Sequence, residues 1–444
     1  MARLARSAPG RGLDDPVLGA WPLAWLALAV FGVSAGYGAL MPLLPGWVAP
    51  LMRSDDSAAI ARHVGLLSSI YAAGVLLGAP LWGLASDRWG PARVLVVGLI
   101  GQAASLMPLW RPEGIGLAGV YASRGATGFF VAAVVPVVPA LVAEYTPQDR
   151  RARRFAWLGA VSLLGFLFGP GLDAAAGHWA AMLHRIGAVT IGATDLVIAS
   201  SVAWGALTML GLATALPRGT AGSRASPRHA GAQEASAADR RHALALWGLN
   251  GVVMFVLSGF ELGIVLQGLQ HPSLSQGRLS LMFAECSLVM LGVNGLLFFT
   301  SLLDRAAGRG LMAGGLLLAV AGLALLSQHG SDAPMYVGIS LTAAGTGLVL
   351  PTVTYLAAGA APQRLGATMG GLTAAAGLGQ TLGAAAAGGL FGSVAQLGFA
   401  WLALPLLAPL GMLMLRPAWW SAADRARCPP SSTADPADPA DPAG

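Results

Sequence analysis

Three charged side chains lie inside long apolar stretches, where a charge is costly to keep in a membrane. Glu261 lies in SGFELGIVLQ and Glu285 in LMFAECSLVM. Their helices are antiparallel, and both acids are expected roughly 10–12 Å from the outer end of their helix, at about 1.5 Å of rise per residue. A carboxyl group at that depth tends to hold a proton, and two close together favour keeping one of them protonated. The pair therefore predicts a proton-binding site, unless the two acids face apart and hydrogen-bond to Asn294, Gln267 or backbone.

Arg124 is the third of these charges, and it lies in the stretch YASRGATG. It is expected on the order of 15 Å below the end of its helix. A cation at that depth is rarely kept without an acidic partner or a water-filled cavity. Arg124 is therefore a candidate for proton transfer or anion binding. The alternative is an arginine that bonds backbone carbonyls and only holds helices together.

The composition excludes several classes of protein. Of 444 residues, 55% are hydrophobic and only 10% are charged, too few charges for the surface of a soluble enzyme. The two cysteines, Cys286 and Cys428, exclude a disulfide scaffold. The net charge of +6 comes from dispersed arginines without any lysine, so no basic stripe for nucleic acid exists. The sequence therefore predicts an integral membrane protein.

Apolar stretches of about 20 residues, the length that crosses a bilayer, predict the elements that hold these charges. We predict an all-α membrane protein with twelve transmembrane helices: 22–46, 64–84, 93–111, 114–143, 155–177, 196–216, 244–269, 278–302, 310–328, 335–358, 366–392 and 397–415. The fourth and eleventh are long enough to predict tilt.

Arginine placement predicts the orientation of these helices. With the N-terminus inside, twenty of the 26 basic residues fall in cytoplasmic segments and five in outer loops, while Arg124 falls within a span. Cytoplasmic loops of membrane proteins carry such an excess of positive charge. We therefore expect both termini to be cytoplasmic.

The polar segments divide the chain into two halves. We predict a cytoplasmic N-terminal tail (1–21), a six-helix bundle (22–216), a flexible cytoplasmic linker (217–243), a second six-helix bundle (244–416) and a disordered cytoplasmic tail (417–444).

Sequence elements of the first half recur in the second at a near-constant offset. Asp87-Arg88 recurs as Asp304-Arg305 after 217 residues, and Pro136 recurs as Pro351 after 215. Pro147-Gln148 and Gly165-x-x-x-Gly169 recur at 215 and 214, as Pro362-Gln363 and Gly379-x-x-x-Gly383. Two parallel six-helix repeats predict a transporter whose substrate site lies between the halves near the bilayer midplane.

The loop between the second and third predicted helices, GLASDRWGPAR, resembles the corresponding loop of the major facilitator superfamily. The resemblance covers nearly the whole chain. It implies a cytoplasmic latch that holds one conformation closed, formed by Gly83, Asp87, Arg88, Gly90 and Arg93, with Asp304 and Arg305 as its repeat. The glycines allow a tight turn and close helix approach. The alternative is that the arginines only set topology.

Two further elements resemble this superfamily. Arg124, followed by Thr127-Gly128, is similar to its Arg-x-x-Gln-Gly element, which implies a role in proton transfer or anion binding. The fifth predicted helix carries Gly165, Gly169 and Pro170, similar to the Gly-x-x-x-Gly-Pro element of its proton-coupled exporters. We expect these residues to form a hinge. Asp173 replaces the first glycine of the closing pair and adds an acid near the outer face, in a pathway role or at a hydrated helix end.

Together these patterns predict a secondary active transporter, most simply a proton antiporter that exports a small organic or amphipathic compound. The compound is a drug-like molecule or a secreted metabolite such as a siderophore. Uptake by proton symport and a non-transporting membrane sensor are the alternatives. We expect a monomer in the bacterial inner membrane with protons, substrate and lipid as partners. We expect no enzymatic activity, cofactor, metal site or nucleic acid, and without lysine the chain has no nucleotide-binding phosphate loop.

Overall fold

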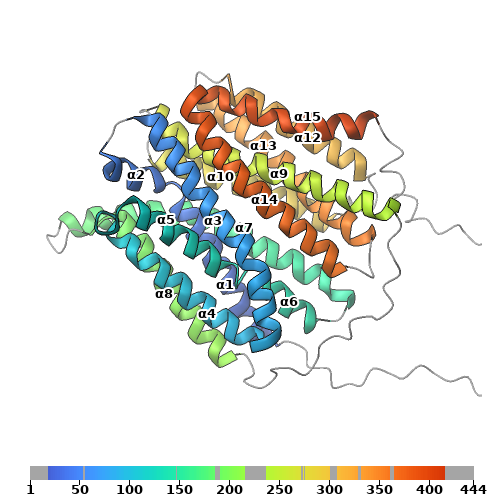
Figure 1. The fold of residues 1–444 in the computed structure, drawn as a ribbon, viewed down its shortest axis with the longest axis horizontal. Helices are drawn as coiled ribbons and strands as arrows, with labels where there is room; N and C mark the ends of the chain where they lie inside the picture. Colours follow the sequence, from blue (N-terminus) through green and yellow to red (C-terminus); the bar gives the residue numbers. More distant parts are fainter. Residues whose placement is uncertain are drawn as a thin grey trace, which may run out of the picture.

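A computed structural model describes residues 19–53, 56–146, 148–185, 191–215, 237–271, 274, 276–300, 308–328, 332–360 and 365–415. All regular structure in these ranges is helical. Figure 1 shows one elongated bundle in which the N-terminal helices (blue to green) lie on one side and the C-terminal helices (yellow to red) on the other. This arrangement agrees with the predicted division into two helical halves.

The N-terminal half contains α1 (Ala20–Leu40), α2 (Leu44–Met52), α3 (Ser57–Trp89), α4 (Pro91–Leu106), η1 (Met107–Trp110), α5 (Pro112–Val131), α6 (Val137–Glu144), α7 (Gln148–Arg185) and α8 (Ala193–Ala215). The C-terminal half contains α9 (Ala237–Gln270), α10 (Gln276–Phe299), α12 (Gly308–Leu326), α13 (Asp332–Ala360), α14 (Leu365–Val394), η3 (Ala395–Leu397) and α15 (Gly398–Leu415). Helix α9 begins at Ala237, inside the segment predicted as linker. The predicted tails and the rest of the linker lie outside the described residues.

Ten stretches of the described residues are long and apolar enough to cross a membrane. One of them, Thr368–Leu415, is 48 residues long and includes both α14 and α15. The prediction of a helical membrane protein is therefore confirmed. Its count of twelve spans is not reached by length and composition alone, because α5 is absent from the ten.

The fourth predicted span is not one continuous helix, and that part of the prediction was wrong. Gly116 interrupts α5 with φ 64° and ψ −179°. The chain then leaves the helix between Val131 and Val137, next to Pro136, and resumes as α6. A proline lacks the N–H that continues a helical ladder. Its counterpart Pro351 lies inside the unbroken helix α13, so the two repeats differ here.

The first predicted span is also divided, because α1 ends at Leu40 and α2 begins at Leu44. The two helices are joined by the turn Met41–Leu43, which contains Pro42. We call the end of the bundle that carries α2 and the start of α3 the α2 end. The opposite end carries the end of α8 and the start of α9, and we call it the linker end.

Close contacts between the halves lie at the α2 end and in the middle of the bundle. A Cβ atom added to Gly65 of α3 would lie 2.6 Å from the Cα of Gly388 on α14, so the two backbones touch. Deeper along the same helices, the Ser69 hydroxyl donates to the Thr381 carbonyl at 2.8 Å. Figure 1 shows α3 and α14 side by side at the α2 end and diverging toward the lower right. The halves are therefore sealed at the α2 end by close backbone packing.

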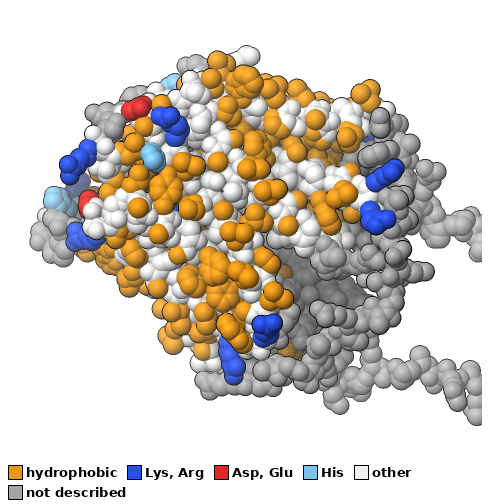
Figure 2. All heavy atoms as spheres, in the orientation of Figure 1, with side chains coloured by type: hydrophobic (Ala, Val, Ile, Leu, Met, Phe, Trp, Pro, Cys, Tyr) orange, Lys and Arg blue, Asp and Glu red, His pale blue; other side chains and the backbone are white. Residues whose placement is uncertain are grey.

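The outer surface matches a lipid environment. Leucines at 77, 81 and 84 of α3 are between 55% and 65% exposed. Figure 2 shows hydrophobic side chains spread over the visible face, with charged side chains near the ends of the bundle. Such a surface would be unfavourable in water and is stable against hydrocarbon.

Candidate functional site

Arg124 is fully buried in α5, on the face that packs against α3. Its Cζ atom lies 4.7 Å from the centre of the Tyr71 ring, a cation–π contact. None of its three guanidinium nitrogens has a hydrogen-bond partner among the described residues. The alternative in which backbone carbonyls hold Arg124 as structural glue is therefore not what the structure shows. Five donors in a low-dielectric setting remain available to an acceptor.

A row of four aromatic rings leads from Arg124 to the other half. Tyr71 lies 5.2 Å from Tyr37 of α1, and Tyr37 lies 5.9 Å from Phe166 of α7, between ring centres. Phe166 in turn contacts Phe283 of α10 at 6.2 Å. We call these four residues the aromatic row. Because Phe283 belongs to the C-terminal half, the row crosses the interface between the halves.

Glu261 approaches the aromatic row from the C-terminal half. It lies on α9 and is partly exposed, although its neighbours Phe260 and Leu262 are fully buried. No hydrogen bond or ion pair of its carboxyl group is present among the described residues. Glu261 and Arg124 both lie within electrostatic range of the Tyr37 hydroxyl group.

Glu285 has a different environment. It lies on α10, and its Oε1 accepts a short hydrogen bond from the hydroxyl of Ser340 on α13. Its Oε2 is buried and has no partner among the described residues. The structure shows no direct contact between Glu285 and Glu261, although Cys286 interacts electrostatically with both. Among the described residues the two acids therefore form no hydrogen bond with each other, and Glu285 is bound within its own half.

Asp173 is buried, with 4% of its surface exposed. Its Oδ2 accepts from the hydroxyl of Ser280 on α10 at 3.4 Å, so the contact joins the two halves. The reading of Asp173 as a hydrated helix end was wrong, because α7 continues to Arg185 and α10 covers the acid. This leaves Asp173 as a polar contact of the sealed α2 end.

The glycines of α7 allow the close helix approach that their spacing predicts. A Cβ atom on Gly165 would lie 2.4 Å from the carbonyl oxygen of Phe31, and one on Gly169 would lie 2.7 Å from the backbone nitrogen of Ala39. Any larger side chain would push α1 and α7 apart. Pro170 lies inside α7, which the structure shows as continuous. The hinge role of these residues stays a prediction.

The predicted latch is only partly described. Gly90 joins α3 to α4 with φ 85°, a conformation that favours glycine, and this confirms the tight turn. Gly83 has no atom of another segment near its Cβ position, so close helix approach at this glycine is not observed. Arg88 and Arg93 are exposed. The Asp87 side chain, Asp304 and Arg305 lie outside the described residues.

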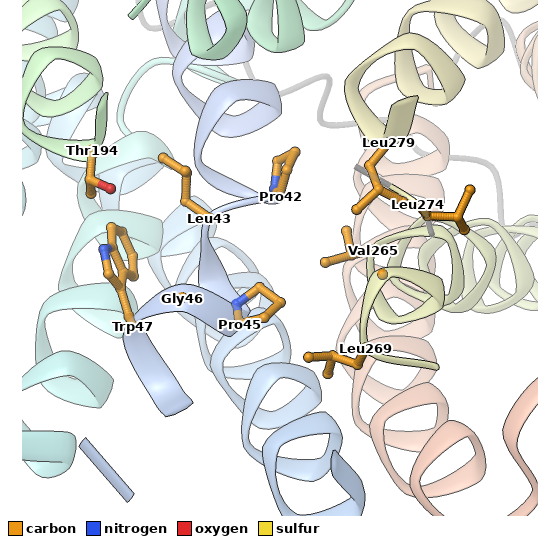
Figure 3. A pocket seen from close by; sticks show the side chains of 11 residues that line it. Pro42, Leu43, Pro45, Gly46, Trp47, Thr194, Val265, Leu269, Leu274 and Leu279 are labelled. Carbon is orange, nitrogen blue, oxygen red and sulfur yellow. The ribbon is translucent and has the colours of Figure 1, made fainter. Parts of the chain in front are cut away.

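A cavity lies away from Arg124, Glu261 and Glu285. A space of about 240 Å³ opens at the α2 end between the α1–α2 turn and helices α9 and α10 (Figure 3). Most of the side chains that line it are apolar, with Pro42, Leu43 and Trp47 on one side and Val265, Leu269 and Leu279 on the other. None of the predicted site residues lines it. Within the described residues, no group of three or more His, Cys, Asp or Glu side chains could hold a metal ion.

Sequence reasoning missed the residues that connect the charges. The chain has only six tyrosines, and two of them lie next to this charge: Tyr71 contacts Arg124, and Tyr37 contacts Tyr71. Because tyrosine is scarce in the apolar stretches, these two residues could have been identified as site candidates from the sequence. Ser340 and Ser280 could not be identified from the sequence, because single serines in apolar helices commonly bond their own backbone.

The fold and the site define a membrane transporter. Two helical halves pack together, and an aromatic row that begins at the buried cation Arg124 crosses between them. A sequence profile of the Major Facilitator Superfamily matches residues 26–296, and the chain belongs to this family.

Individual relatives match shorter parts of the chain. The tetracycline resistance protein, class B, of Escherichia coli is 36% identical over 143 residues, which are 32% of this chain and 34% of that protein. The quinolone resistance protein NorA of Staphylococcus aureus is 26% identical over 168 residues, 38% of this chain and 40% of that protein. The chain thus spans between about a third and two fifths of the length of these curated relatives.

Solved structures agree with the fold along almost the whole chain. The human organic anion transporter MFSD10 (TETRAN) superimposes with a TM-score of 0.65 at 20% identity, covering 88% of this chain and 99% of that one. A bacterial homolog of the human lysosomal transporter Spinster gives 0.64 at 17% identity, covering 91% and 97%. At these identities the likeness concerns the fold alone.

Proposed function

We propose that this transporter exports a small organic or amphipathic compound in exchange for protons, across the inner membrane of a bacterium. The observation that carries the proposal is Glu261, an acid without a hydrogen-bond partner among the described residues, on α9 of the C-terminal half and within electrostatic range of Tyr37 of the N-terminal half. A carboxyl group in such surroundings favours its protonated form, and contact with water or a cation favours the charged form. Opening and closing of the interface would therefore bind and release a proton.

The structure has the asymmetry that alternating access requires. Backbone contacts seal the α2 end, and α3 and α14 diverge toward the linker end (Figure 1). The arginine distribution supports a cytoplasmic position of the linker end and of both termini. In this reading the described conformation is closed to the outside. A proton bound from outside would favour this state, and its release inside would free Glu261 for substrate.

The relatives support export of a drug-like compound. Two of them are named for resistance to tetracycline and quinolone. A membrane transporter gives resistance most directly by moving the compound out of the cell. Secreted metabolites such as siderophores belong to the same chemical range. The protein is proposed to act as a monomer, with lipid, substrate and protons as its partners and without a cofactor.

The latch residues are assigned a supporting role. Asp87, Arg88 and their repeat Asp304-Arg305 are proposed to hold the linker end closed when the α2 end opens. Asp87→Asn should reduce turnover while membrane insertion remains normal. Transport by this variant at the wild-type rate would refute the latch.

Transport by inside-out vesicles tests the function. Tetracycline and norfloxacin serve as probes, and a proton gradient with an acidic lumen is imposed. Export predicts accumulation in the lumen that is abolished when the gradient is collapsed. Gradient-driven movement in the opposite direction would favour the symporter, and absence of gradient-dependent flux across a broad compound panel would overturn both readings in favour of a sensor.

A further inference from the structure

The chain between α5 and α6 keeps backbone hydrogen bonds but changes their register. The amides of Ala133 and Val134 donate to carbonyls three residues back, at 3.0 and 2.9 Å, instead of the four residues of an α-helix. The amide of Val135 donates four residues back at 3.2 Å, so the α pattern returns there. Two residues in 3₁₀ geometry therefore join the two helices, and we call residues 132–136 the junction.

This change of register takes the α-helical donor, the amide of Ala133, away from the carbonyl of Phe129. The indole N–H of Trp82 on α3 donates to that carbonyl instead, at 2.7 Å. Trp82 is buried, and its ring packs against Phe129 and Phe130 at 5.5 and 5.9 Å between ring centres. A carbonyl without a donor is costly inside a membrane, so the indole stabilises the junction in this geometry.

The neighbouring helices leave room for the junction. A Cβ atom added to Gly98 of α4 would overlap with the Cβ of Ala133. One added to Gly78 of α3 would lie 2.8 Å from the carbonyl oxygen of Phe129. Residues 132–134 are completely buried. The junction is therefore a closely packed element of the fold.

The second half of the chain lacks this element. Pro351 stands where the repeat places Pro136, yet α13 is continuous there. The repeat offsets of 215 to 217 place residues 297–299, a leucine and two phenylalanines, at the position of Trp82. None of these three side chains has a hydrogen-bond donor. The indole donor and the 3₁₀ junction thus occur together in one half and are both absent from the corresponding described residues of the other.

We propose that the junction is a two-state switch in which the Trp82 indole and the Ala133 amide compete for the Phe129 carbonyl. In the described conformation the indole occupies the carbonyl and the junction is 3₁₀. When the amide takes its place, the junction becomes α-helical and α5 and α6 form one helix. Conversion of two residues from three to 3.6 residues per turn rotates α6 by roughly 40° about its axis.

The position of α6 links this rotation to access. Helix α6 packs mainly against α1, α3, α4 and α7 of its own half. Figure 1 shows it at the lower right, on the side where α3 and α14 diverge. Rotation of α6 presents a different face toward the C-terminal half at this open end. The 3₁₀ junction thus belongs to the conformation with an open linker end, and the α-helical junction to the one in which that end closes.

NMR of the indole N–H groups tests the competition directly, on the full-length protein labelled with ¹⁵N-tryptophan in detergent. The Trp82 signal is the one that Trp82→Phe removes. Pro136→Ala restores an amide donor for the Ala132 carbonyl and so favours the α-helical junction. It should shift the Trp82 signal upfield, toward that of an unbonded indole. Pro351→Ala in the continuous helix α13 is the matched control and should leave the signal unchanged.

Labelling at the opposite end tests the link to access. Ala61 is 3% exposed at the sealed α2 end. A cysteine at this position, with Cys286 and Cys428 replaced by alanine, should react slowly with a water-soluble maleimide. Addition of Pro136→Ala should accelerate the reaction at least about fivefold, because removal of the proline favours the α-helical junction and, with it, opening of the α2 end. Addition of Pro351→Ala should not change the rate.

Two results would overturn the proposal, provided that melting temperatures show folded variants. A Trp82 signal that Pro136→Ala leaves unchanged would exclude competition for the carbonyl. Equal labelling rates in the two proline variants would exclude coupling of the junction to access. Neither measurement involves a substrate or a proton gradient, so a switch that works as described stands whether the vesicle experiment shows export, uptake or no transport.

Discussion

Glu261 and Glu285 lie on neighbouring helices of the same half, yet their surroundings differ. Glu285 accepts a hydrogen bond from Ser340 and so is fixed between α10 and α13. Glu261 has no such bond among the described residues and interacts with Tyr37 of the opposite half. A bonded acid inside one half changes little when the halves move, whereas an acid at the interface changes its environment completely. This difference is why we propose that Glu261, rather than Glu285, carries proton coupling.

The largest effect is expected for Glu261→Gln. The amide cannot titrate, so gradient-driven transport of norfloxacin by proteoliposomes should fall at least about tenfold, as for an essential proton-transfer group. Exchange of labelled for unlabelled norfloxacin needs no net proton movement and should persist. Retention of gradient-driven transport would show that another group carries the proton.

Removal of the cation should give the next largest effect. Arg124→Gln deletes the buried charge that shares Tyr37 with Glu261, and transport should fall on the order of tenfold. Its melting temperature should equal or exceed that of wild type, because a buried unpaired charge is destabilising. A strongly destabilised Arg124→Gln protein would mean that Arg124 has a bonding role that the structure does not show.

The seal at the α2 end gives a third prediction, which separates Glu261 from Glu285. Gly388→Val places a side chain against the Gly65 backbone and should hold α3 and α14 apart. Glu261 should then react several-fold faster with a water-soluble carbodiimide added on the α2 side, since protonated carboxyl groups react with this reagent. Glu285 should react at its wild-type rate. Gly389→Val is the control, because nothing lies near that Cβ position.

Equal acceleration of both acids would show that Glu285 also faces the interface. No acceleration of either acid would show that the glycine contact is not the seal.

The smallest transport effect is expected for Glu285→Gln. The amide still accepts the Ser340 hydrogen bond, so transport should stay within about threefold of wild type and stability within about 1 kcal/mol. Ser340→Ala leaves the carboxyl group unbonded and should cost about 1–3 kcal/mol, measured by thermal unfolding in detergent. A complete loss of coupling in Glu285→Gln would reverse the assignment.

The sequence predicted the helical membrane fold well, because apolar length and arginine placement are direct consequences of the bilayer. The glycines of α7 also packed as their spacing indicated. The break at Pro136 was not predicted, since the equivalent Pro351 lies in a continuous helix and local residue type alone does not separate the two.

The site was predicted only in part. Arg124, Glu261 and Glu285 stood out because charge is rare in apolar stretches. Their relation to one another depends on how α1, α3, α5 and α9 meet, which periodicity does not encode. For that reason the aromatic row was missed, and the bond between Glu285 and Ser340 was not predicted.

Proton release on ligand binding tests the central claim most directly. Norfloxacin is added to unbuffered protein in detergent, and the pH change is followed for wild type, Glu261→Gln and Glu285→Gln. The account predicts proton release by wild type and Glu285→Gln and none by Glu261→Gln, with all three proteins folded. Release by Glu261→Gln at the wild-type level, or its loss only in Glu285→Gln, would contradict the assignment of coupling to Glu261.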